Sequence, residues 1–159
     1  MKQIPVYKKR KVATFALVDD EDFERVNQYK WKLFWNGSRF YVTTSQNGKP
    51  VGLHDFILGT KPVDHKDNDP LNNRRKNLRA CTISQNNMNR TKPQTWRNQK
   101  CVTSQYKGVS FYPNGKYQAK GWFGKQFHLG YFNTETEAAR VYNQFAQQHF
   151  GEFARLNNV

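Results

Sequence analysis

Acidic, imidazole and amide side chains are gathered in the segment VDHKDNDPLNNRRKNLRACTISQNNMNR, residues 63–90. Asp64 and His65 are adjacent, and Asn77 and Asn86 follow Asp64 by thirteen and twenty-two positions. An imidazole can take up a proton near neutral pH, and carboxylate and amide oxygens are ligands for hard divalent cations. Each of these residues alone is typical of a polar turn or a solvated helix face. Their joint spacing favours a catalytic site.

The chain is strongly basic, with 26 Lys and Arg against 12 Asp and Glu in 159 residues, a net charge of +14 and a pI near 9.9. This balance predicts an anionic partner, and nucleic acid is the first candidate because Lys and Arg that neutralise phosphates release condensed counterions. A membrane surface is the rival partner. The chain has no apolar run of the roughly 18 residues that would span a bilayer, and its N-terminus has no signal-type apolar core. We therefore expect no membrane partner.

Two cysteines, Cys81 and Cys101, are present without a CxxC pair. Neither a disulfide framework nor a structural zinc ribbon is indicated. We expect a folded, cytoplasmic protein that is not secreted. An aromatic content of 15% also argues against a disordered basic tail.

The elements expected to position the candidate site occupy the first part of the chain. Asp19 or Asp20 caps a predicted helix that runs to about Gln28, and residues 31–35 and 39–44 form a predicted hairpin about an Asn36-Gly37 turn. Residues 53–59 read as a short helix closed by Gly59. Residues 63–90 then read as strand, polar loop, strand and helix, with Ser84 as the N-cap.

A polar stretch at residues 88–105, which includes Pro93, shows no apolar period and reads as a linker. After it, residues 106–113, 116–123 and 125–132 predict a three-stranded antiparallel meander with turns at Asn114-Gly115 and Gly124. Thr134 and Glu137 form a predicted capping box. The helix that follows carries an apolar face expected to pack on the sheet, made of Ala138, Val141, Tyr142, Phe145 and Ala146.

The segment 63–90 resembles the HNH homing-endonuclease family through VDH, LNNRR, NLR, T-x-SQN and NMNR. The resemblance implies a ββα-metal (His-Me finger) site in which His65 is the general base and Asn77 holds it in orientation. Asp64 and Asn86 are then the ligands of one divalent cation, Mg²⁺ before Mn²⁺. Arg74, Arg75 and Arg79 are expected to contact phosphates, which suits the planar guanidinium.

Two positions depart from the family pattern. His54 is carried over as a further catalytic residue, but the residue after it is Asp55, where the family usually has a basic one. Lys66-Asp67-Asn68 stand where relatives often have an apolar residue, Asn and Gly. Asn68 is expected to take the left-handed conformation of that glycine.

Residues 104–157 resemble the plant ethylene-response-factor DNA-binding domain through YKGV, WFGKQFHLGYF, TxxEAARVYNQFA and GEFARLN. In that fold the sheet enters the major groove. The DNA-facing residues carried over by position are Lys107, Ser110, Tyr112, Lys116, Lys120, Trp122, Gln126 and His128. Those expected under the helix are Val109, Ala119, Phe123 and Leu129. Family arginines are replaced at Ser110, Tyr112, Trp122 and Gln126, so a different target site is expected. The alternative is an exposed sheet whose aromatic residues only stabilise strand pairing.

The sequence thus predicts an α+β chain with a nuclease domain at residues 1–92 (metal motif about 53–90), a linker at 93–104 and an ethylene-response-factor-like domain at 105–159. The pairing resembles phage and prokaryotic HNH proteins, which implies a bacterial or phage-infected cell and hydrolysis of double-stranded DNA to 5′-phosphate and 3′-hydroxyl ends. No obligatory protein partner is indicated, and both a monomer and a dimer remain open. The alternatives are a non-catalytic, sequence-specific DNA-binding regulator with a decayed nuclease core and, third, an RNA-binding protein. Lys8, Lys9, Arg10 and Lys11 form either a phosphate-gripping arm or a solvated segment.

Overall fold

The computed structural model describes residues 1–36, 39–92, 95–96, 99–100, 103–113 and 115–159. The chain divides into two compact units, residues 1–86 and residues 87–159, and each is described by itself. Both units combine β-strands with α-helices, in agreement with the predicted α+β class. Within the described residues no helix has the length and apolar character needed to cross a membrane. Cys81 is a free thiol, and Cys101 lies outside the described residues.

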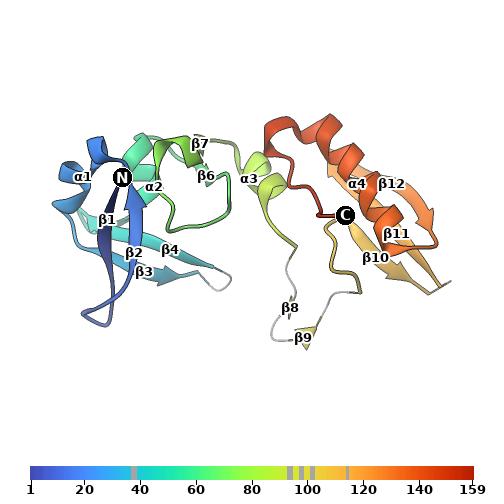
Figure 1. Cartoon of the computed structure of the whole chain (residues 1–159), viewed down its shortest axis with the longest axis horizontal. Helices are drawn as coiled ribbons and strands as arrows, with labels where there is room; N and C mark the ends of the chain where they lie inside the picture. Colours follow the sequence, from blue (N-terminus) through green and yellow to red (C-terminus); the bar gives the residue numbers. More distant parts are fainter. Residues whose placement is uncertain (37–38, 93–94, 97–98, 101–102, 114) are drawn as a thin grey trace. The chain divides into compact units, whose positions relative to one another are not determined.

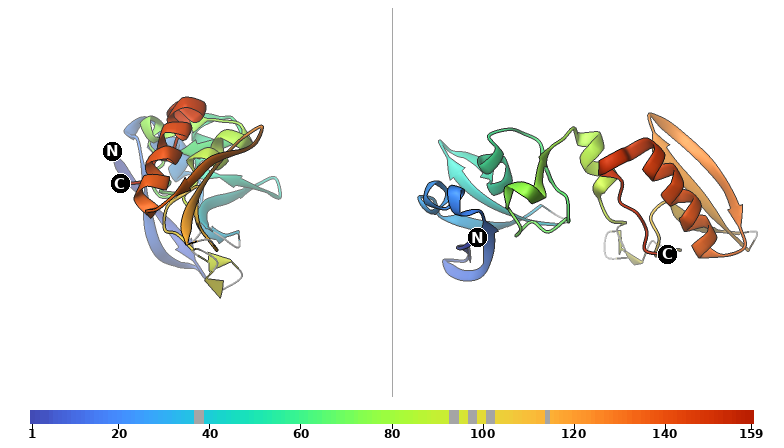
Figure 2. Two further views of the ribbon diagram at one scale, coloured as in Figure 1. Left: turned by 90° about the vertical axis from the view of Figure 1, so that its right-hand side faces the viewer. Right: turned by 45° about the horizontal axis from the view of Figure 1, so that its top comes forward.

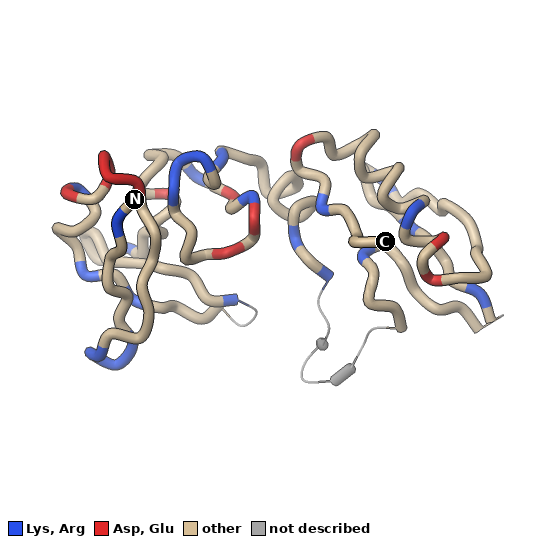
Figure 3. Tube along the Cα trace, in the orientation of Figure 1, with Lys and Arg blue, Asp and Glu red and all other residues tan. Residues whose placement is uncertain are grey.

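A five-stranded sheet of order β2-β1-β3-β4-β5 forms the body of the first unit (Figure 1). Its strands are β1 (Lys2–Lys8), β2 (Lys11–Val18), β3 (Trp31–Trp35), β4 (Phe40–Gln46) and β5 (Lys49–Gly52). The predicted β3–β4 hairpin is confirmed, although Gly37 of its predicted turn lies outside the described residues. The β1–β2 hairpin is not among the sequence predictions. Its turn holds the basic cluster, with Lys9 and Arg10 at positive φ (Figure 3).

Two short helices cover one face of this sheet. Alternate residues of β1 and β2, among them Ile4 and Val6, are buried in a single core with Trp31, Leu53 and Ile57. Helix α1 (Asp20–Asn27) begins after its N-cap Asp19, and α2 (Leu53–Leu58) ends at Gly59 with φ 67°, both as predicted. The left-handed C-cap suits glycine because it has no Cβ. This packing fixes α2 against the strand that carries the candidate site.

The predicted order of strand, loop, strand and helix is confirmed for residues 63–89. Strands β6 (Val63–His65) and β7 (Leu78–Ala80) pair antiparallel, the 3₁₀ helix η1 (Arg75–Asn77) precedes β7, and α3 (Ile83–Asn89) follows. The predicted N-cap Ser84 is wrong. Thr82 Oγ1 accepts from Gln85 N at 3.1 Å and Gln85 Oε1 accepts from Thr82 N at 2.8 Å, so a capping box starts the helix two residues earlier.

The second unit contains the predicted meander, which is confirmed as the three-stranded sheet β10-β11-β12. The strands are β10 (Val109–Tyr112), β11 (Lys116–Phe123) and β12 (Lys125–Phe132), followed by α4 (Glu135–Phe150) and the 3₁₀ helix η2 (Gly151–Phe153). The capping box of Thr134 and Glu137 is present as predicted. Within the stretch read as a linker, β8 (Thr95–Trp96) and β9 (Gln99–Lys100) form a two-stranded ladder, and part of that stretch lies outside the described residues.

Helix α4 lies across one face of this sheet (Figure 2). The contact is close, since a Cβ added at Gly121 would lie 2.2 Å from Cε1 of Phe145. Val109 and Ala119 are buried and Leu129 packs against the core, as predicted for the helix side. The same prediction is only partly correct for Phe123. It is 45% exposed and meets the last turn of the helix at His149 and Phe150, with ring centroids 5.2 and 6.4 Å away.

Candidate active site

The β6–β7 ladder places Asp64 opposite Arg79, and both side chains are nearly buried. Asp64 Oδ2 accepts hydrogen bonds from Arg79 Nε at 3.0 Å and from Nη2 at 2.8 Å. Such a charge-assisted pair fixes the carboxylate in one orientation. Arg79 therefore positions Asp64, and its predicted phosphate contact remains a prediction.

His65 is held by a residue to which the sequence prediction gave no role. Asn73 is fully buried, its Nδ2 donates to the carbonyl of Pro70 at 2.9 Å, and its Oδ1 lies 3.1 Å from His65 Nε2. The bond to Pro70 fixes which end of the amide faces the imidazole. Since an amide oxygen only accepts, the neutral imidazole carries its proton on Nε2 and its lone pair on Nδ1. Burial lowers the pKa of His65, which keeps the ring neutral near pH 7.

The side chain of Asn77 stabilises the loop between β6 and β7. Its Nδ2 donates to Asp67 Oδ1 at 2.9 Å and to the carbonyl of Asn72 at 2.7 Å, and its Oδ1 accepts from Asp67 N at 3.2 Å. Although burial opposes it, hydrogen bonds from the backbone of Asp69 and from both asparagines lower the pKa of Asp67. Asn68 has φ 65°, as predicted. The loop thus accommodates Lys66-Asp67-Asn68, where the sequence departs from the family pattern, through hydrogen bonds of its own side chains.

The β2 strand anchors the same loop through its backbone. Leu17 N donates to the carbonyl of Leu71 at 2.7 Å, and Asn73 N donates to the carbonyl of Leu17 at 2.9 Å. These two bonds form a short parallel bridge between Leu17 and Asn72. The residue that orients His65 is therefore held in place by the N-terminal hairpin.

The guanidinium of Arg75 is paired with carboxylates of helix α1. Its Nε and Nη2 donate to the buried carboxylate of Asp22 at 2.8 and 2.9 Å, and Glu21 lies 2.7 Å from Nε. Ligand atoms of Asp19, Glu21 and Asp22 lie within 4.8 Å of one another, as in a cation site. Arg75 pairs with Glu21 and Asp22, and Arg25 pairs with Asp22, so two of the three negative charges of this cluster are offset. The geometry favours a role for Arg75 in stability, and its predicted phosphate contact is untested.

His54 lies beside His65, with their ring centroids 5.0 Å apart in an edge-to-face arrangement. Burial and repulsion from His65 and Lys61 lower the pKa of His54 to about 3. Its Nε2 is 3.4 Å from Oδ1 of Asp55, and burial raises the pKa of that carboxyl. Two imidazoles that are both neutral near pH 7 therefore lie together at the base of the site.

The other predicted site residues lie on the elements that flank β7. Asn86 is half-buried on α3, which follows β7 after only Cys81 and Thr82. Arg74 donates from Nε to Asn72 Oδ1 at 2.8 Å. The donor chemistry of Asp64 and Asn86, one carboxylate and one amide oxygen, fits Mg²⁺, which usually takes one or two protein oxygens and completes its shell with water and phosphate.

Two side chains of the second unit bear on the predicted DNA-facing set. Lys107 Nζ donates to the carbonyl of Met88 in the last turn of α3, and its contact with DNA remains a prediction. Tyr131, absent from the prediction, lies beside His128 with the ring centroids 4.7 Å apart and the ring planes tilted by 54°. The strands pair with a bulge at Ala119/Lys120, which breaks the period of two and brings Tyr131 to the same face as His128.

Of the predicted DNA-facing side chains, Tyr112 and Trp122 are 42% and 65% exposed. The register pairs Trp122 with Gln126, Lys120 with His128 and Tyr112 with Lys116. Ser110 is paired with Gln118, a buried residue that the prediction missed, which donates to the hydroxyl of Tyr131 at 2.9 Å. These pairs form a mixed aromatic and polar face.

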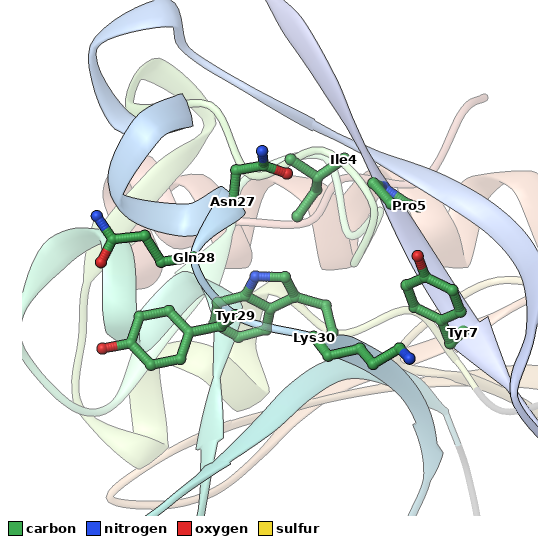
Figure 4. Close-up of a pocket in the computed structure, with 8 residues that line it drawn as sticks. Ile4, Pro5, Tyr7, Asn27, Gln28, Tyr29 and Lys30 are labelled. Atoms are coloured by element: carbon green, nitrogen blue, oxygen red, sulfur yellow. The ribbon is translucent and has the colours of Figure 1, made fainter.

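An open hollow of about 270 Å³ lies between β1 and the segment that joins α1 to β3 (Figure 4). At the edge of the hollow, the ammonium of Lys30 lies 5.0 Å from the centre of the Tyr7 ring. The indole N–H of Trp31 donates to the carbonyl of Val26. Among the described residues around the hollow, none has a carboxylate or an imidazole. The hollow therefore brings together none of the acidic or imidazole groups that the sequence singled out.

Comparison with known proteins agrees with this location. Residues 59–88 match a family model described as HNH endonuclease. An uncharacterized HNH endonuclease of Acanthamoeba polyphaga mimivirus is 35% identical over 156 residues, which covers 92% of this chain and 76% of the relative. No solved structure matches the chain.

Proposed function

Because the chain belongs to the HNH endonuclease family and is a nuclease, we propose that it hydrolyses phosphodiester bonds of DNA with His65 as the general base and with a divalent cation. The buried hydrogen bond between Asn73 and His65 is the observation that carries this proposal. It supports a neutral imidazole with its lone pair on Nδ1. This is the protonation state that a general base needs before it takes a proton from water.

In the proposed reaction, Nδ1 of His65 takes a proton from the attacking water as the water oxygen bonds to phosphorus. The bond from phosphorus to the 3′ oxygen breaks and that oxygen takes a proton from solvent water, which leaves a 5′-phosphate and a 3′-hydroxyl end. Asn73 keeps Nδ1 available by holding the proton on Nε2, and Arg79 holds Asp64 in a fixed orientation. When bound by Asp64 and Asn86, the cation would stabilise negative charge on the leaving oxygen.

A plasmid assay tests this proposal. Supercoiled plasmid is incubated with the protein and Mg²⁺, Mn²⁺ or EDTA, beside Asp64→Asn, Asn86→Ala and the neighbouring Asn87→Ala as a matched control. We expect metal-dependent conversion to open-circle or linear DNA, lost in the first two variants and kept in the control. Plasmid that is shifted on a gel but never cut with either metal would contradict the proposal.

We also propose that the outer face of β10–β12 reads the major groove, as the resemblance to the ethylene-response-factor domain implies. The support is the exposed, mixed face in which Trp122 pairs with Gln126 and Lys120 with His128. A bidentate contact to a base edge contributes about 1–3 kcal/mol of discrimination. Selection of bound sites from random duplexes should therefore yield a consensus that Gln126→Ala and His128→Ala relax. Equal enrichment of all sequences by the wild-type protein would leave the sheet without a reading role.

A further inference from the structure

Two large aromatic side chains meet at the exposed end of the β3–β4 hairpin. Trp35 and Phe40 pair directly across the strands, with ring centroids 4.7 Å apart and exposures of 52% and 43%. The next pair inward on the same face, Leu33 and Val42, packs in the core. The core face of the sheet thus extends outward into a solvent-exposed aromatic pair, which we call the aromatic tip.

Cationic groups and the candidate active site lie next to the aromatic tip. Lys8 Nζ is 5.6 Å from the centre of the Phe40 ring. Arg39 Nη1 donates to Asn68 Oδ1 at 3.1 Å, and Asn68 N donates to the carbonyl of His65 at 2.9 Å. The hairpin end is therefore tied to the loop that follows the general base, and the two lie side by side in Figure 1.

We propose that the aromatic tip binds a locally unpaired stretch of the DNA strand next to the scissile phosphate. Trp35 and Phe40 stack on its bases, and Lys8 contacts its phosphate backbone. Exposed rings beside cations are the usual platform for unpaired nucleic acid, because every base has a π-face and every nucleotide a negative charge. Paired bases present only their edges in the grooves, so intact duplex offers these rings no stacking partner. The inference rests on the proposed action on DNA.

The test measures binding without cleavage, so that a failure of the nuclease proposal does not affect it. The full chain with His65→Ala, in EDTA, is titrated into labelled intact duplex and into the same duplex with a central unpaired bubble, and the anisotropy is followed. Trp35→Ala with Phe40→Ala should weaken binding to the bubble by roughly tenfold or more, the effect of losing base stacking on aromatic rings. Binding to intact duplex should change less than threefold. Lys8→Ala should reduce the salt dependence of bubble binding by about one counterion.

Phe34→Ala is the matched control. Phe34 is 54% exposed and lies next to Trp35 on the same strand, but it pairs with Tyr41 on the opposite face. The Phe34→Ala variant should bind both DNAs as the parent protein does. The Trp35→Tyr variant should keep most of the affinity for the bubble that the alanine substitution removes. An unchanged affinity in the double variant would overturn the proposal. So would an equal loss on both DNAs, or an equal loss from Phe34→Ala.

Discussion

The substitution Asn73→Ala tests how the site keeps His65 ready to accept a proton. It removes the acceptor for His65 Nε2–H and the donor to the carbonyl of Pro70, which lie at 3.1 and 2.9 Å in a fully buried position. Each polar group left without a partner costs about 1–3 kcal/mol of stability. The imidazole is then free to change tautomer and to rotate. Because general-base catalysis contributes roughly 10²–10⁴-fold, a misoriented His65 should lower the cleavage rate by about 10–100-fold.

The same substitution should also move the pH profile. Burial, the larger effect, lowers the pKa of His65, whereas the hydrogen bond that its Nε2 donates to Asn73 raises it. Without Asn73 the pKa falls further, so the acid limb of single-turnover cleavage should shift to lower pH while the plateau rate drops. The KM for DNA should stay unchanged, because a fully buried residue does not touch the substrate.

Asn72→Ala is the matched control for this experiment. Asn72 is also buried in the same loop, and it donates to Asp67 and accepts from Arg74. It should lose comparable stability in urea unfolding, but its acid limb should not move. An Asn73→Ala variant with a wild-type rate and an unmoved acid limb, or two variants with the same rate and pH profile, would refute the reasoning.

Three further predictions concern stability. With its pKa lowered from 6.5 to about 3, His54 contributes stability that is complete above pH 6.5 and is lost as the pH falls toward 3. The free energy of unfolding, measured in urea, should fall by up to about 1.4 kcal/mol for each pH unit in this window. His54→Phe should make this free energy less dependent on pH. Arg75→Ala, which leaves the buried Asp22 with one guanidinium fewer, should cost about 1–3 kcal/mol in the same assay with an unchanged KM for DNA. Asn157→Ala removes two hydrogen bonds to the backbone at the start of the second sheet and should lower the stability of that unit by about 1–3 kcal/mol, measured by its thermal unfolding.

Local signals were sufficient for the elements that have them. The capping box of Thr134, the left-handed Gly59 and the alternation in β3 and β4 each depend on neighbouring residues, and each is confirmed. The capping box at Thr82 carries the same signal, with Gln85 three residues later, and was missed in favour of Ser84. Local rules therefore predict that a helix forms more reliably than the residue at which it starts.

The site residues that the sequence did not reveal depend on contacts distant along the chain. Asn73 reaches His65 only because the backbone of Leu17 holds the intervening loop, a pairing for which the sequence has no local signal. The contact of Arg75 with Asp22, which lies 53 residues earlier in the chain, likewise has no local signal in the sequence. In the second unit, a bulge placed Tyr131 on a face that strict alternation assigns to its neighbours. These outcomes depend on tertiary packing.

Chemical rescue of His65→Ala tests the central claim most directly. Single-turnover cleavage of an end-labelled duplex is measured for the wild-type protein and the variant, with Mg²⁺ and increasing imidazole, at a protein concentration that saturates DNA binding. We predict that the variant binds DNA normally, cleaves it at least a hundredfold more slowly, consistent with the roughly 10²–10⁴-fold typical of general-base catalysis, and regains activity as imidazole is added. A variant that cleaves at the wild-type rate without imidazole would contradict the role of His65 as the general base.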